Sequence, residues 1–302
     1  MLGATPSPKH PAAIPAPDWT THAYRAYPEM MWSGALTHEQ VNDIYNFMAA
    51  NRSLVMGVPG WNSTMSLRAP FGLAFGLLQY DMVERFLLHF YSISAHGYTR
   101  GTLTTPQSSN LANRDEPTLP YASTGIHTVP IYLKWMLVFE GPETHTPGCL
   151  WLGKAVPRDW LVAGEVPLLV QNATTRYGRV SFSLAVAPST NEAGGSTVHA
   201  SVTLPPSFAT VRRVGCGAIL QWPSNFHHFW LTFGHFGSSL RIRAHAGAGK
   251  LSGATVGGNA WSSFDPAEET VDLSASQLTP SLIAAGLPSI VATYTAQLAA
   301  NG

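Results

Sequence analysis

The sequence predicts an α+β protein of two domains, in which helices come first and an antiparallel β-sandwich follows. The helical prediction rests on apolar residues that recur at helical spacing from about residue 38 to residue 139. The sandwich prediction rests on the second half, where from about Leu150 short apolar runs are bounded by Gly, Pro, Asn and Ser. We therefore expect a proline-rich linker or tail over 1–26, a helical region over 27–148 and a β-sandwich domain over 149–302.

The helical region begins with a well-marked helix. Thr37 is followed three residues later by Gln40, which is the pattern of a capping box, and apolar residues then recur at helical spacing. The sequence therefore predicts a helix over 38–51. It predicts a loop over 52–65, because Gly and Pro cluster there.

Two further helices are expected in this region. Pro70 suits the first turn of a long helix that continues to about Tyr91, and the apolar side chains of that helix nearly encircle it, as in a buried helix. The third helix is expected over Ile126–Phe139, with a bend at Pro130.

The second half is expected to consist of short strands and one short helix. The helix is predicted over Ser276–Ala285, with Thr279 as its cap and Pro280 at its first position. The expected strands are Leu168–Asn172, Arg179–Val186, Thr197–Leu204, Ala218–Trp222, Ser239–His245, Gly253–Val256 and Thr270–Leu273.

The composition argues against several classes of partner. Lys plus Arg and Asp plus Glu both number 17, so the formal net charge is zero, whereas binding to nucleic acid or to an anionic membrane surface needs a basic excess. No apolar run approaches the roughly 20 residues of a membrane span. The first residues lack the apolar core of a signal peptide, so none is predicted in this chain, and an extracellular or secretory location stays open. Two cysteines make neither a disulfide framework nor a zinc site, and we expect no metal and no cofactor.

Residues 95–125 are the most distinctive part of the sequence. They combine polar, charged and aromatic side chains, although charged residues are only 11% of the chain and about 25% is usual. A long loop of this kind inside a compact domain is usually either functional or disordered, and the aromatic residues and the flanking helices favour a functional loop. Aromatic faces beside dense hydrogen-bonding groups suit a sugar. Core packing is the alternative for the aromatic candidates. The side chains that we expect to bind a carbohydrate are Trp61, His96, Tyr98, Arg100, Gln107, Arg114, Glu116 and Tyr121.

Three stretches of the sequence resemble six-hairpin glycosidases: LLHFYSISAHGYTRGTLTTPQ, RDEPTLPYASTGIHTVPIYLKWMLVFE and GKLSGATVGGNAWSSFDPAEETVDL. The resemblance covers residues 27–295 and is to the C-terminal part of those proteins. It implies a partial (α/α)6 toroid with an active site at its mouth, followed by a β-sandwich that buttresses it. A complete toroid needs more helices than this chain has room for. We therefore expect either a missing N-terminal half or an oligomeric partner to cover the apolar helix faces.

The function that the resemblance implies is hydrolysis of a glycosidic bond by carboxylate acid/base catalysis. Such hydrolysis normally needs two carboxyl groups that flank the bond. Asp115 is the predicted catalytic or substrate-orienting carboxylate. Its neighbour Glu116 points the other way in an extended chain, so the second catalytic group would come from the missing half. A salt bridge from Asp115 to Arg114 or Arg100 is the structural alternative.

Two other functions are also compatible with the sequence. Gln107 stands where a carboxylate would be plausible, which favours a non-catalytic carbohydrate-binding or structural module. A polysaccharide lyase would need a Tyr or His base and a group that neutralises charge, and Tyr98, His96 and Arg100 are of those types.

Overall fold

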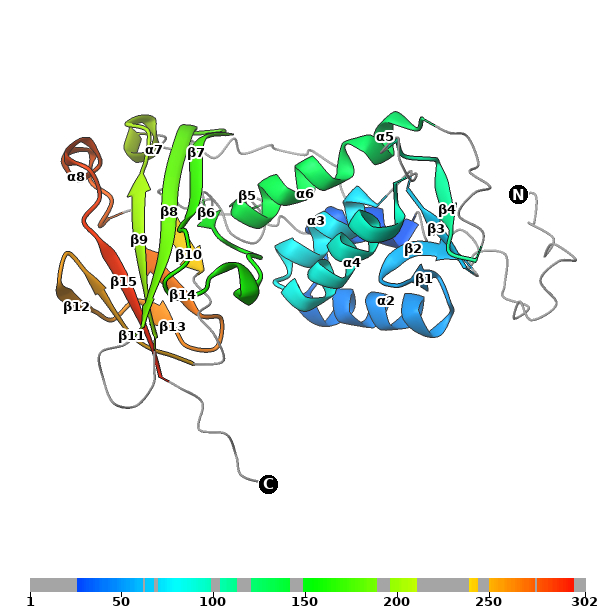
Figure 1. Cartoon of the computed structure of the whole chain (residues 1–302), viewed down its shortest axis with the longest axis horizontal. Helices are drawn as coiled ribbons and strands as arrows, with labels where there is room; N and C mark the ends of the chain where they lie inside the picture. Colours follow the sequence, from blue (N-terminus) through cyan, green and yellow to red (C-terminus); the bar gives the residue numbers. More distant parts are fainter. Residues whose placement is uncertain are drawn as a thin grey trace, which may run out of the picture. The chain divides into compact units, whose positions relative to one another are not determined.

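The computed structural model of the chain divides into two compact units, Met1–Leu137 and Val138–Gly302 (Figure 1). The residues that it describes are 26–61, 63–67, 70–98, 104–112, 121–141, 149–188, 196–210, 239–243, 250–274 and 276–295. The chain contains both helices and strands, as a mixed α+β protein does, which confirms the predicted fold class at that coarse level. We describe each unit by itself.

The first long helix of the first unit follows the sequence prediction closely. After a short helix over 26–32, α2 spans His38–Ala50. Its capping box is complete. The Gln40 backbone amide donates to the Thr37 hydroxyl at 3.2 Å, and the Thr37 backbone amide donates to the Gln40 side-chain oxygen at 2.9 Å. Val41, Tyr45 and Met48 lie on its buried face.

The single helix predicted between Pro70 and Tyr91 is wrong, because the structure has two helices there. α3 spans Phe71–Gln79 and α4 spans Val83–His96. The chain breaks at Asp81, whose φ of 58° lies in the left-handed region, and the Met82 amide then closes back on the Leu77 carbonyl at 2.7 Å. The break contains neither Gly nor Pro, so the pattern of apolar residues runs through it unchanged.

The loop predicted over 52–65 is also wrong, and the first unit is therefore not all helical. It contains an antiparallel four-stranded sheet in the order β1-β2-β3-β4. Met56 and Gly57 both have positive φ, which makes the two-residue turn that a tight hairpin requires. The strands are β1 (Leu54–Val55), β2 (Val58–Trp61), β3 (Thr64–Ser66) and β4 (Ser108–Asn110).

The third predicted helix is present but shifted. α5 spans Ser123–Ile126 and α6 spans Thr128–Leu137, and residues 138–140 form a strand instead of the end of the helix. The expected bend at Pro130 is absent from α6, because Pro130 lies in its first turn, where a missing backbone N–H costs nothing.

The second unit contains two sheets, whose strands Figure 1 shows in two layers. The five-stranded sheet has the order β13-β14-β10-β6-β5, and β6 pairs with β10 in parallel, which corrects the expectation of a purely antiparallel sandwich. Its strands are β5 (Val138–Glu140), β6 (Cys149–Leu152), β10 (Ser239–Arg243), β13 (Phe264–Asp265) and β14 (Thr270–Leu273).

The six-stranded sheet is antiparallel throughout and has the order β12-β11-β15-β9-β8-β7. Its strands are β7 (Leu168–Thr175), β8 (Gly178–Pro188), β9 (Ser196–Thr203), β11 (Lys250–Val256), β12 (Asn259–Trp261) and β15 (Ile290–Thr295). Short helical segments η1 (Arg158–Trp160), α7 (Ser207–Thr210) and α8 (Pro280–Ala285) connect the strands. The predicted cap of α8 is confirmed, since the Leu282 amide donates to the Thr279 hydroxyl at 3.2 Å.

Most predicted strands are confirmed, as β7, β8, β9, β10, β11 and β14, whereas Ala218–Trp222 lies outside the described residues. The core lies between the two sheets. Alternate residues such as Phe182, Leu184, Val198 and Ile290 on the six-stranded sheet are buried. So are the side chains on one face of the five-stranded sheet, namely Leu150, Leu152, Leu240, Ile242, Val271 and Leu273.

Candidate functional site

The residues predicted to bind a carbohydrate are only partly within the described chain. Arg100, Arg114, Asp115 and Glu116 lie outside the described residues, so the predicted catalytic carboxylate has no described position. The other five candidates belong to the first unit, and they are Trp61, His96, Tyr98, Gln107 and Tyr121.

One hydrogen bond joins the segment of His96 to the strand that follows Gln107. His96 ends α4, and its carbonyl accepts a hydrogen bond of 2.7 Å from the hydroxyl of Ser109 on β4, just after Gln107. The His96 Nδ1 atom is buried, and it has no hydrogen-bond partner among the residues that the structure describes. Trp61 and Tyr121 are 43% and 68% exposed, so neither is a core residue. The pocket found among the described residues includes neither of them.

A buried histidine that the sequence analysis missed lies in the core of the first unit. The Nδ1 atom of His89 is 2.8 Å from the Gly57 carbonyl, and its Nε2 atom is 3.2 Å from the Tyr132 hydroxyl. Because a carbonyl can only accept, Nδ1 carries the proton and Nε2 accepts from Tyr132. Burial lowers the pKa of His89 to about 4, against a smaller opposing effect of the Gly57 hydrogen bond. The ring is therefore neutral near pH 7, and with both nitrogens satisfied it is a structural group.

Three cationic side chains of the second unit lie near one indole ring. The Trp151 ring centroid is 3.3 Å from the Lys154 Nζ atom, 4.9 Å from the Arg241 Cζ atom and 5.2 Å from the Arg243 Cζ atom. Cations are attracted to the face of an indole, and the attraction is stronger where water is excluded. Trp151, Lys154 and Arg243 are each at most 3% exposed.

Acidic side chains lie next to this group. Arg241 forms ion pairs with Asp272 at 3.2 Å and with Glu268 at 3.7 Å. Burial raises the pKa of Asp272, and the Arg241 guanidinium opposes that rise. The Arg243 Nε atom donates to the Glu268 carbonyl at 2.9 Å. Trp151, Lys154 and Arg243 form the buried part of this network, which suits stabilisation of the sheet, whereas Arg241, Asp272 and Glu268 are partly exposed at its rim.

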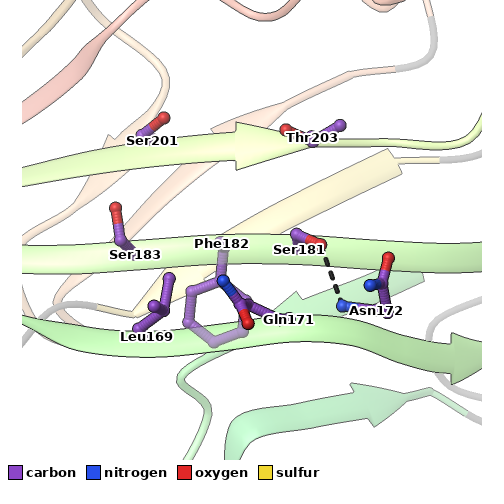
Figure 2. Close-up of a pocket in the computed structure, with 8 residues that line it drawn as sticks. All are labelled: Leu169, Gln171, Asn172, Ser181, Phe182, Ser183, Ser201 and Thr203. Carbon is purple, nitrogen blue, oxygen red and sulfur yellow. Dashed lines mark hydrogen bonds between the residues drawn. The ribbon is translucent and has the colours of Figure 1, made fainter.

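An open pocket lies instead on the outer face of the six-stranded sheet, where strands β7, β8 and β9 run side by side (Figure 2). Its volume is about 300 Å³, at the lower end of the range for small-ligand sites. The lining residues are Leu169, Gln171, Asn172, Ser181, Phe182, Ser183, Ser201 and Thr203. None of them is charged, and six of them carry a hydroxyl or a carboxamide.

The register of the strands brings these polar groups together. Leu169 lies opposite Ser183, and Ser183 lies opposite Ser201, while Ser181 lies opposite Thr203. Residues two apart on a strand point to the same face, so the two cross-strand rows form one surface. Phe182 points to the opposite, inner face and is buried.

A β-bulge lies at one end of the pocket. The register of β7 shifts between Val170 and Ala173, and Asn172 takes a left-handed φ of 54°. The Asn172 backbone amide donates to the Ser181 hydroxyl at 2.9 Å, which Figure 2 shows as a dashed line. Gln171 keeps the alternation that begins at Leu169, and the bulge brings Asn172 into the same pocket lining.

Within the described ranges, no three or more His, Cys, Asp or Glu side chains are placed so that they could hold a metal ion. No helix among the described elements is both long enough and apolar enough to cross a lipid bilayer.

The comparisons with known proteins found no matching family model, no similar curated protein and no similar solved structure.

Proposed function

We propose that the chain is a carbohydrate-binding protein, and that the pocket on strands β7, β8 and β9 is its site for a neutral glycan. The observation that carries the proposal is the lining, which offers hydroxyls and carboxamides and no charge. A neutral sugar presents many hydroxyls, and each can donate to or accept from Ser, Thr, Asn and Gln side chains. Leu169, which is 60% exposed, adds an apolar contact for the C–H face of a sugar ring.

The proposal is for binding rather than cleavage at this pocket. Hydrolysis of a glycosidic bond normally needs two carboxyl groups that flank it, and the lining contains neither Asp nor Glu. Hydrolysis through Asp115, and elimination by a lyase through Tyr98, His96 and Arg100, stay predictions of the sequence. So does the resemblance to six-hairpin glycosidases that gave rise to them.

The test is to measure the binding of a panel of neutral and acidic oligosaccharides to the full chain by calorimetry. Thr203→Val removes one pocket hydroxyl at nearly constant volume, and Gln171→Ala removes a carboxamide. Thr255→Val, on β11 and outside the pocket lining, is the matched control. Loss of one hydrogen bond of about 1 kcal/mol weakens binding about fivefold.

The expected result is that a neutral glycan binds to the wild type and that both pocket variants bind it more weakly. Thr255→Val should bind it as strongly as the wild type does. Binding of no glycan would overturn the proposal, and so would equal binding by all three variants. Turnover of the same panel tests the hydrolase prediction separately. Turnover that is lost in a folded Asp115→Asn variant would establish an enzyme with Asp115 at its centre.

A further inference from the structure

The outermost strand of the six-stranded sheet has an open edge. β7 is last in the sheet order and pairs with β8 on one side, and no described strand pairs with its other side. The backbone N–H and C=O groups along such an edge are a template for another strand. Natural proteins usually protect an edge with charged residues, with proline or with a bulge.

The protection of this edge is weak in its first half. The sequence from Val166 to Thr175 contains no charged residue, and Pro167 lies before the strand rather than in it. The bulge at Gln171 and Asn172 protects only the middle of the strand. Leu168, Leu169 and Val170 precede the bulge and keep regular pairing with β8, so their outer edge is straight.

Large apolar side chains are exposed along the same edge. Val166 is 87% exposed, the highest value among the large apolar residues described, and Leu169 is 60% exposed. Val162 is 50% exposed and belongs to the segment just before the strand, where the Gly164 amide donates to the Val186 carbonyl of β8 at 3.3 Å. Single exposed apolar residues are ordinary, but several beside an unpaired strand edge mark an interaction surface.

The chemistry of this edge suits a second copy of the same strand. An acidic or basic partner would find no opposite charge between Val166 and Thr175. Two identical neutral strands meet without repulsion, and a two-fold axis gives both copies the same contacts. Antiparallel pairing about Leu169, the centre of the straight part of the edge, would continue each sheet into the other, and it would satisfy the edge backbone groups of Leu168–Val170 and cover Leu169 in both copies.

We propose that the edge of β7 is a homodimer interface, at which two copies of the chain pair their β7 strands antiparallel about a two-fold axis. The apolar residues Val162 and Val166 extend this contact beyond the ends of the paired strands. Leu169 lines the pocket and Val166 does not, so a substitution at Val166 tests the pairing of the chains without altering the pocket lining.

The experiment is sedimentation velocity of the full chain over a wide range of protein concentration. Val166→Lys places a charge on the loop before the edge, where it does not disturb the folded strands, and Leu169→Lys places one on the edge itself. Ile126→Lys, at an exposed apolar residue of α5, is the matched control. Circular dichroism of each variant confirms that its fold is intact.

The expected result is a wild-type chain that shifts from one copy to two as the concentration rises. Both edge variants should stay monomeric over the same range, and Ile126→Lys should behave as the wild type. A wild-type chain that is monomeric throughout would overturn the proposal. Dimerisation of a folded Val166→Lys variant with unchanged strength would also overturn it, because the contact would then lie elsewhere.

Discussion

The buried imidazole of His89 makes the stability of the first unit depend on pH in a direction that can be worked out. The folded pKa of about 4 lies below the ordinary 6.5, because burial disfavours the charged ring. The neutral ring therefore contributes stability that is fully present above pH 6.5. That contribution is lost as the pH falls through 6.5 toward 4, since the unfolded chain then binds a proton that the folded chain cannot accept.

The size of the effect follows from the same pKa. A fall from 6.5 to about 4 corresponds to about 3 kcal/mol at full protonation of the unfolded ring. His89→Gln removes the titrating group but keeps an amide that can donate to the Gly57 carbonyl. Near pH 7.5 this variant should be less stable than the wild type by about 1–3 kcal/mol, because the Tyr132 hydroxyl loses a partner.

The assay is urea unfolding of the full chain at several pH values between 7.5 and 4. The difference in unfolding free energy between the wild type and His89→Gln should shrink, and then reverse, as the pH falls. His127→Gln, at an exposed residue between α5 and α6, is the control for the substitution itself. A difference between the wild type and His89→Gln that stays constant over this range would refute a neutral buried His89.

Three further predictions concern stability and use the same urea assay. Thr37→Ala should lower the unfolding free energy by about 1 kcal/mol through loss of the α2 cap, and Thr37→Ser should restore most of it. Gly57→Ala should cost at least about 1–2 kcal/mol, because φ is +77° there and the new Cβ would lie 3.0 Å from the Leu88 Cγ atom; an unchanged midpoint would contradict this turn. Leu184→Ala should cost about 2–5 kcal/mol, because the side chain is fully buried between the two sheets, and a cost below 1 kcal/mol would mean that they do not enclose it.

The parts of the fold that the sequence predicts are those with a local cause. The cap of α2 needs only Thr37 and Gln40, and the cap of α8 needs only Thr279 and Pro280. Strands β7, β8 and β9 were recognisable because short runs rich in β-forming residues are bounded there by turn residues. In each case the signal and the structure lie within a few residues of each other.

The parts that were missed depend on distant residues or on strain. The first sheet is completed by β4, which lies far along the chain from β3. Because that pairing is not visible in the local sequence, the segment of β1, β2 and β3 resembles a Gly- and Pro-rich loop. Cys149–Leu152 is buried on both faces and shows no alternation. Asp81 adopts a left-handed φ, and no glycine at that position indicates it in the sequence.

The candidate site was missed for a related reason. Ser181, Ser183, Ser201 and Thr203 look like ordinary solvent-facing residues of separate strands. The register of β8 against β9 sets them in rows, and the bulge of β7 places Asn172 beside those rows. The predicted site residues, in contrast, were chosen from one continuous segment, of which only part is described.

The parallel pairing of β6 with β10 has a consequence for how the chain folds during synthesis. Leu150 and Leu152 on β6 meet Leu240 and Ile242 on β10, which follow much later in the sequence. Contacts between such distant segments raise the contact order and slow folding, whereas the first unit is complete when residue 137 has been made. We therefore expect the first unit to fold on the ribosome before β10 has been synthesised. Until then β6 lacks its parallel partner, and its leucines stay exposed and can bind chaperones.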